Sequence, residues 1–246
     1  MQASFKEFSP AKLNLFLKIV SKRDDGYHNI RSGLTLINLF DEVTAKKDSG
    51  FSIKYKGEFS PKDNKFEDCI IEKIFAKLDI EKPNYAFTIT KNIPIMSGLG
   101  SASSNAAAVI RILEKLNFKN LKKKNFAKIG ADVPFFINNY DSLIRGNGNI
   151  VIKQFYPKYY FLIIKPLQSC STKIMYNQIE NERLYIDPSL DTEEINEEDI
   201  GNDFEIILKN QSNEINILLE FMKTLPNNIF SSLTGSGSCI FTAFES

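Results

Sequence analysis

Residues 93–116 read IPIMSGLGSASSNAAAVIRILEKL, and this stretch points to both the fold class and a first functional hypothesis. It predicts a loop over 94–100 that follows a strand and leads into a helix over 101–116. Gly98 and Gly100 allow the backbone to turn tightly and to approach a ligand closely. The free N–H groups at the start of the helix, together with the positive end of its dipole, would form an anion site.

Three serines at the start of this helix can add hydroxyl donors or a metal-facing oxygen: Ser101, Ser103 and Ser104. The loop lacks the Gly-Lys-Ser/Thr ending of a Walker A motif. Ser103 also stands where the third glycine of a dinucleotide fingerprint would be. Ordinary capping of a Ser-rich helix start explains the same residues. The loop alone therefore leaves both interpretations open.

The flanking sequence mixes strands and helices without a regular βαβ rhythm. Residues 13–19 alternate apolar and polar side chains, which predicts a strand with one buried face. The pattern also predicts strands over 34–40, 51–55, 85–90, 159–164 and 239–244, and helices over 68–78, 122–129 and 204–208. Asp41-Glu42 is interpreted as the exit from the strand over 34–40. We therefore expect an α+β fold in two lobes, with domains over 1–152 and 153–246.

Composition excludes several classes of function. The 246 residues carry 31 basic and 30 acidic side chains, so a general affinity for nucleic acid or an anionic membrane is not expected. The only histidine, His28, rules out a multi-histidine metal site. The three cysteines form no CxxC pair, which is typical of a reducing compartment. No apolar run approaches the roughly 20 residues that span a bilayer. The expectation is a soluble, cytoplasmic protein without a membrane or nucleic-acid partner.

A few polar residues outside the loop are candidates for chemistry. Lys12 and Asn14 project from the same face of a strand, about 6–7 Å apart, although a solvated face would look the same. Asp132 lies between Gly-Ala and Val-Pro-Phe-Phe, where the local sequence by itself favours a helix N-cap. Tyr27 and His28 follow the turn signal Asp25-Gly26, and a plain surface turn also fits them.

Four ordered segments resemble the GHMP small-molecule kinases: PAKLNLFLKI at 10–19, PIMSGLGSASS at 94–104, GADVPFF at 130–136 and LTGSGSCIF at 233–241. The segment KRDDGYHNIRS at 22–32 resembles the branch that phosphorylates 4-diphosphocytidyl-2-C-methyl-D-erythritol in the non-mevalonate route to isoprenoid precursors. The resemblance implies a ribosomal S5 domain 2-like N-terminal lobe and a ferredoxin-like C-terminal lobe. It also implies ATP as co-substrate, with Mg²⁺, and phosphoryl transfer to the 2-hydroxyl.

The resemblance assigns the chemistry to two residues. Asp132 would be the catalytic base that takes the proton of the attacking hydroxyl. Lys12 would lie beside it and stabilise the developing alkoxide. Asn14 would bind the methylerythritol part of the substrate, and Asn202-Asp203 would be structural and open the helix over 204–208.

The remaining implied contacts are with nucleotides. Tyr27 and Tyr176 would sandwich the cytosine and His28 would contact its edge, while the glycine turn near the C-terminus would line the cleft with Gly235, Ser236 and Gly237. Asn64 and Lys91 resemble positions near the adenosine. The ATP phosphates would lie on the loop formed by Pro94, Ile95, Met96, Ser97, Gly98, Leu99, Gly100, Ser101, Ala102, Ser103 and Ser104. Here the loop reads SGLGSASS, where the family often has GGLGGGSS, so we expect a stiffer loop and weaker ATP binding.

Three alternatives stay open. The first is another GHMP kinase, of the homoserine or mevalonate type, which would have no cytosine to stack. The second is an RNA-binding module that uses Lys119 and the lysines at 122–124, although that run lacks interleaved aromatic residues. The third is an inactive kinase that senses nucleotide. The sequence also leaves open whether the chain is a monomer or a homodimer.

Overall fold

The computed structural model describes residues 4–245, apart from residues 64, 65, 67, 119, 120, 122, 123, 169, 171 and 183–200. Internal contacts divide the chain into two compact units. The first unit contains Met1–Ala11, Leu36–Ile95 and Gly100–Asn139, and the second contains Lys12–Thr35, Met96–Leu99 and Tyr140–Ser246. Because each unit is built from several segments, this division differs in kind from the expected domain boundary after residue 152, which stays a prediction.

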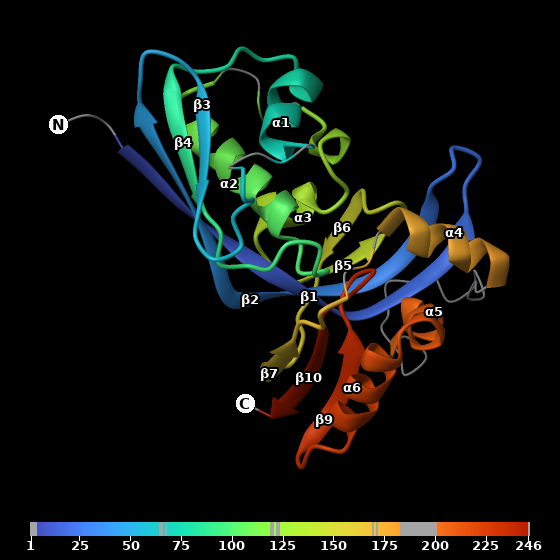
Figure 1. The fold of residues 1–246 in the computed structure, drawn as a ribbon. Helices are drawn as coiled ribbons and strands as arrows, with labels where there is room; N and C mark the ends of the chain where they lie inside the picture. Colours follow the sequence, from blue (N-terminus) through green and yellow to red (C-terminus); the bar gives the residue numbers. More distant parts are fainter. Residues whose placement is uncertain are drawn as a thin grey trace. The chain divides into compact units, whose positions relative to one another are not determined.

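The first unit is a twisted sheet covered by helices. Its strands lie in the order β3-β4-β2-β1, with β4 antiparallel to β2 and parallel to β3. The strands are β1 (Ser4–Lys22), β2 (His28–Lys47), β3 (Ser52–Lys56) and β4 (Tyr85–Thr90), of which β1 and β2 continue into the second unit. Helices α1 (Ile70–Leu78), α2 (Ser101–Lys115) and α3 (Val133–Asn138) lie on one face (Figure 1).

An apolar core joins these helices to the sheet. Phe87 and Ile89 of β4 pack with Ile74 of α1 and with Val109 and Leu113 of α2, and all of them are buried. Burying a side chain of this size contributes about 1.5–3 kcal/mol. This core fixes α2, and therefore its N-terminal end, on the sheet.

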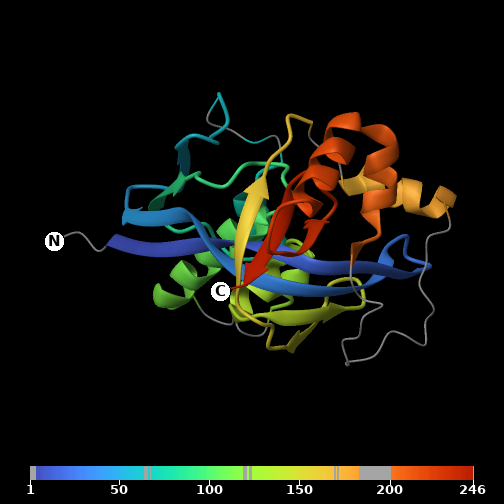
Figure 2. The ribbon, with the colours of Figure 1, turned by 90° about the horizontal axis from the view of Figure 1, so that it is seen from below.

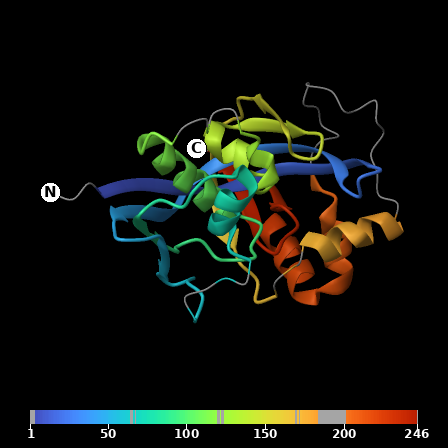
Figure 3. The same ribbon diagram turned by 90° about the horizontal axis from the view of Figure 1, so that it is seen from above.

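The second unit combines the other ends of β1 and β2 with shorter elements. The hairpin of β5 (Ser142–Arg145) and β6 (Ile150–Lys153) lies beside β2, to which β5 pairs antiparallel (Figure 3), and β8 (Gly201–Asn202) pairs in parallel with β1. A separate antiparallel sheet has the order β7-β10-β9. Its strands are β7 (Tyr159–Ile164), β9 (Asn228–Leu233) and β10 (Ile240–Glu245), and helices α5 (Phe204–Gln211) and α6 (Asn213–Lys223) lie along it (Figure 2). Helix α4 spans Thr172–Glu182.

The mixed α+β architecture is confirmed, and several predicted elements agree closely with the structure. Three details are wrong. The strand over 13–19 is not buried on one face only, because Lys12, Asn14 and Phe16 are buried as well as their apolar neighbours. Asp41 does not begin an exit, because β2 continues to Lys47. In place of the predicted helix over 122–129, the described part of that stretch forms a short 3-10 helix, η2 (Phe126–Lys128).

Within the described part of the chain, no helix has both the length and the apolar character that crossing a membrane requires.

Candidate active site

The loop between β4 and α2 has the backbone geometry that its glycines predict. Gly98 and Gly100 have φ angles of 79° and 75°, and Met96 adopts a φ of 52°. Ser101 and Ala102 already lie in α2, so no left-handed backbone conformation is needed at these two positions. Ile95 and Met96 are exposed and Ser97 and Leu99 are buried, so the loop presents only part of its length to solvent.

The middle of this loop packs against the glycine turn near the C-terminus. A Cβ atom on Gly98 would lie 2.1 Å from the carbonyl oxygen of Thr234, which is too close for any side chain. The backbone N–H of Cys239 donates to the carbonyl of Ser97 (3.0 Å), and that of Lys12 donates to the carbonyl of Leu99 (3.0 Å). Within the second unit, the loop segment, the glycine turn and β1 therefore form one backbone assembly.

Lys12 and Asn14 are both buried in this assembly, with Lys12 only 3% exposed. The Lys12 ammonium donates to Asn14 Oδ1, which also accepts from the backbone N–H of Gly235 (2.7 Å). Asn14 Nδ2 donates to the hydroxyl of Ser32 (2.8 Å). A Cβ atom on Gly235 would lie 3.3 Å from Lys12 Nζ. Asn14 therefore orients the ammonium of Lys12 and holds the glycine turn beside it.

The glycine turn is held from its other side as well. Asn202 Nδ2 donates to the carbonyl oxygens of Leu233 (2.9 Å) and Gly235 (2.8 Å), and the side chain of Asn202 is buried. The hydroxyl of Ser236 shares a hydrogen bond with that of Thr172 at 2.7 Å, and Gly237 has a φ of 91°. The turn is thus a fixed part of the second unit.

Asp132 stands at the N-cap position of α3, as one of the two sequence interpretations predicted. Its side chain makes no capping hydrogen bond, and it is half-buried. The carboxylate is therefore not used as a cap. Asp132 belongs to the first unit and Lys12 to the second, so their pairing stays a prediction.

The three serines at the start of α2 differ in their surroundings. Ser101 Oγ donates to Asp41 (2.8 Å), and Ser104 Oγ accepts from Ser9 Oγ (2.9 Å), and both serines are buried. Ser103 is half-buried, and a Cβ atom on Gly130 would lie 3.3 Å from its hydroxyl oxygen.

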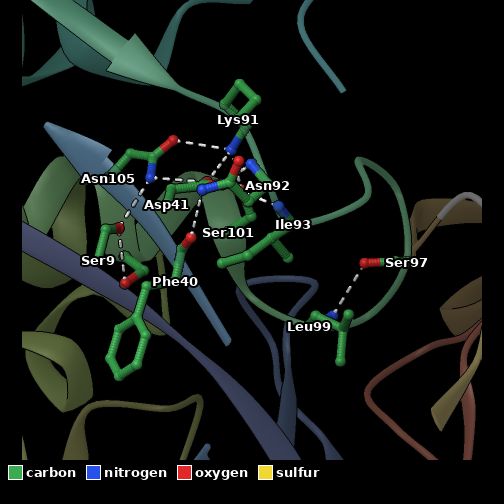
Figure 4. A network of polar contacts seen from close by, with 11 residues as sticks. Ser9, Phe40, Asp41, Lys91, Asn92, Ile93, Ser97, Leu99, Ser101 and Asn105 are labelled. Atoms are coloured by element: carbon green, nitrogen blue, oxygen red, sulfur yellow. Dashed lines mark hydrogen bonds and ion pairs between the residues drawn. The ribbon is translucent and has the colours of Figure 1, made fainter. Parts of the chain in front are cut away.

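Lys91 is buried and its ammonium is bonded within the first unit. It forms an ion pair with Asp41 and donates to Asn105 Oδ1 (2.9 Å; Figure 4). Burial lowers the pKa of Lys91, and the carboxylate of Asp41 opposes that shift. A contact between Lys91 and adenosine stays a prediction. Asn64, the other residue assigned to adenosine, lies outside the described residues.

The predicted cytosine residues lie in the second unit. The rings of His28 and Tyr176 stack with centroids 5.0 Å apart and an interplanar angle of 24°, and Tyr176 also meets the ring of Phe204 edge-on. Tyr27 is 65% exposed, in the turn between β1 and β2. His28 therefore lies against a ring face of Tyr176, while the ring of Tyr27 projects into solvent.

The contacts of four residues that hold the candidate site were not predicted: those of Ser32, Asp41, Thr234 and Asn202. Asn202 was expected only to open the helix over 204–208. Each of the four is a buried polar residue whose bonds reach the loop, Asn14 or the glycine turn. The only local signal was a polar residue inside an apolar strand or beside a glycine motif, and that signal is common in surface positions as well.

The fold and the site define a class of protein: an α+β small-molecule kinase with a glycine loop at a helix start, a buried lysine and a second glycine turn. Residues 65–139 match the family described as "GHMP kinases N terminal domain". The 4-diphosphocytidyl-2-C-methyl-D-erythritol kinase of Caldicellulosiruptor saccharolyticus is 34% identical over 250 residues, which cover 95% of this chain and 86% of the relative. The enzyme of the same name from Blochmanniella pennsylvanica is 35% identical, with 96% and 82% covered.

Solved structures agree on the fold. The crystal structure of a 4-(cytidine 5'-diphospho)-2C-methyl-D-erythritol kinase superposes with a TM-score of 0.76 at 24% identity, and 97% of this chain and 90% of that chain are covered. Mevalonate kinase of Methanococcus jannaschii gives a TM-score of 0.59 at 20% identity, with 99% and 91% covered. The chain belongs to the GHMP kinase family. Within that family it groups with the 4-diphosphocytidyl-2-C-methyl-D-erythritol kinases.

Proposed function

We propose that this chain transfers the γ-phosphoryl group of ATP to the 2-hydroxyl of 4-diphosphocytidyl-2-C-methyl-D-erythritol, giving the 2-phosphate and ADP. The relatives named above support the substrate, and the family supports ATP as the phosphoryl donor. The observation that carries the chemistry is the buried ammonium of Lys12, which Asn14 and the Gly235 turn hold in a fixed position.

Phosphoryl transfer depends on positioning and on neutralising charge, with little covalent chemistry for the protein to perform. Lys12 supplies a positive charge whose orientation is set before substrate binds, so it stabilises the developing alkoxide without reorganisation. Asp132 accepts the proton of the attacking hydroxyl. A carboxylate that makes no capping bond suits this role, because a cap would engage the same oxygens.

The nucleotide side of the site is built on the start of α2. The helix dipole and the backbone N–H groups near Gly100 and Ser101 bind the phosphates of ATP. Mg²⁺ fits this arrangement, because it prefers oxygen ligands and retains several waters when substrate phosphates share its coordination. Of the three serine hydroxyls, that of Ser103 is our candidate ligand, since Ser101 and Ser104 are buried in bonds to Asp41 and Ser9. The ion would neutralise phosphate charge.

The cytosine would stack on aromatic rings at the turn between β1 and β2. Tyr27 has an exposed ring that can close over a base, and His28 and Tyr176 form a stacked pair in the same unit. Stacking of a base on an aromatic ring contributes about 1–3 kcal/mol. This recognition would distinguish the substrate from homoserine or mevalonate, which have no base.

The direct test is ADP release with ATP, Mg²⁺ and each of three acceptors: the cytidyl substrate, homoserine and mevalonate. Turnover with the cytidyl substrate alone is the expected result. Turnover with another acceptor would retain the family chemistry and contradict the cytosine assignment. An affinity for RNA that falls steeply with salt, without turnover, would favour the binding-module alternative. Three of the lysines named for that alternative, Lys119, Lys122 and Lys123, lie outside the described residues. A cytoplasmic location and the choice between monomer and homodimer stay predictions.

A further inference from the structure

A buried carboxylate joins the two ends of the loop between β4 and α2. Asp41 lies on β2 and is fully buried. Its Oδ1 accepts from the backbone N–H groups of Asn92 (2.7 Å) and Ile93 (2.9 Å), the residues that enter the loop. Figure 4 shows both contacts converging on Asp41.

The other oxygen of Asp41 holds the residues that leave the loop. Oδ2 accepts from Ser101 Oγ (2.8 Å) and from Asn105 Nδ2 (3.0 Å), which lie in the first turns of α2. The same oxygen pairs with the ammonium of Lys91, whose other contacts are Ser101 Oγ and Asn105 Oδ1. One carboxylate thus bonds to the chain on both sides of residues 94–100.

The contacts continue away from the loop into β1. Asn105 Nδ2 also donates to Ser9 Oγ (2.8 Å), which in turn donates to Ser104 Oγ (2.9 Å). All of these side chains are buried, so water does not compete for the bonds. The start of α2 is therefore fixed to the sheet by polar contacts as well as by the apolar core.

We propose that Asp41 is a positioning residue for ATP, which fixes the separation of the two ends of the phosphate loop so that its amides are preorganised for the triphosphate. This inference rests on the assignment of the loop to ATP made above. Lys91 serves as the counter-charge that permits a buried carboxylate at this place, because an unpaired charge would be costly to bury. Asp41 does not touch the nucleotide; it acts through Asn92, Ile93 and Ser101.

The test compares affinities of the whole chain for two probes by isothermal titration calorimetry: AMP-PNP, a non-hydrolysable ATP analogue, with Mg²⁺, and CDP for the acceptor side. Asp41→Asn keeps an oxygen for the backbone amides but presents an amide to Lys91 and Ser101. A hydrogen bond to a charged group is worth enough that its loss should raise the Kd for AMP-PNP about tenfold. The Kd for CDP should change less than about twofold, since the cytosine residues lie in the second unit.

Two further variants separate positioning from stability. Ile74→Ala removes apolar core in the same unit without touching the loop ends, and it serves as the destabilised control. Ser101→Ala removes the hydroxyl that donates to Asp41 and accepts from Lys91, and it leaves the Asp41–Lys91 pair in place. It therefore keeps the test informative if Asp41→Asn does not fold. We expect Ser101→Ala to weaken AMP-PNP binding at least about threefold, and Ile74→Ala to leave both affinities unchanged.

Equal AMP-PNP affinity in wild type, Asp41→Asn and Ser101→Ala would overturn the proposal. So would an equal loss in Ile74→Ala, because the effect would then follow stability. Failure of the wild type to bind AMP-PNP would instead refute the assignment of the loop to ATP. Amide hydrogen exchange then decides the structural part: faster exchange at Asn92 and Ile93 in Ser101→Ala than in Ile74→Ala supports the coupling of the loop ends, and equal rates contradict it.

Discussion

Adding a methyl group at Gly98 tests how tightly the loop between β4 and α2 packs on the glycine turn. Gly98 has a φ of 79°, and the added Cβ atom would lie 2.1 Å from the carbonyl oxygen of Thr234. Gly26 supplies a matched control, because its φ is 82° and a Cβ atom there meets nothing within 4 Å. Gly98→Ala and Gly26→Ala therefore share the backbone strain and differ in the collision.

The two costs can be separated. A left-handed backbone conformation costs an ordinary residue about 1–2 kcal/mol, so Gly26→Ala should lose that much free energy of unfolding. Overpacking adds about 1–3 kcal/mol, so Gly98→Ala should lose about 2–5 kcal/mol in total. Urea unfolding followed by far-UV circular dichroism measures both values, provided that the slope with denaturant stays constant.

The collision at Gly98 should also lower the rate of phosphoryl transfer. Thr234 and Gly235 bond to Asn14, which orients Lys12, so moving the turn displaces the ammonium. A displacement of about 1 Å can cost on the order of 100-fold in rate, and we expect a fall in kcat of that order for Gly98→Ala. Equal stability of the two alanine variants would refute the reasoning, because it would mean that the loop and the turn separate without cost.

Other predictions follow from the same geometry. Asp132→Asn should lower kcat by about 10²–10⁴-fold and leave the Kd for AMP-PNP unchanged, and unchanged turnover would remove Asp132 as the base. Asn14→Ala should lower the free energy of unfolding by about 2–4 kcal/mol in urea titration, because the N–H of Gly235 and the ammonium of Lys12 lose a buried acceptor. Burial raises the pKa of Asp203 above its ordinary 3.8, so the folded state binds that proton more tightly than the unfolded state. The free energy of unfolding should therefore fall as pH rises from about 3.8 through the raised value, and Asp203→Asn should show a flatter profile.

Local signals predicted much of the fold. The strand over 85–90 follows a Pro-Asn breaker and the strand over 159–164 is a short apolar run, and both match β4 and β7. The helix predicted from residue 101 begins at Ser101, because glycine marks its boundary. The end of β2 was missed, since Asp41 and Glu42 are typical of a strand exit. Bonds from residues distant in sequence, among them Lys91, Ile93 and Ser101, explain a carboxylate inside the sheet.

The candidate site was predicted only in part, because the contacts that bury its residues also come from positions distant in sequence. Lys12 and Asn14 could be chosen from the motif in β1, but their alternation with apolar residues indicated an exposed face. Their burial comes from Thr234 and Gly235, more than two hundred residues further along the chain, and no local pattern contains that information. The resemblance of four motifs supplied what periodicity could not, namely which polar residues act together.

Asp41 and Asn14 share one physical feature: each accepts a hydrogen bond from the backbone N–H of a loop residue. A buried ion pair is weak evidence for stability, because an apolar pair of similar volume often stabilises a protein equally well. Asp41 and Lys91 therefore need another reason to occupy the interior, and the backbone amides of Asn92 and Ile93 provide one, since no apolar side chain could accept from them. Asn14 follows the same logic, because it accepts from a backbone N–H of the glycine turn. In both units these interior polar groups hold loop backbone in place through hydrogen bonds that no apolar side chain could make.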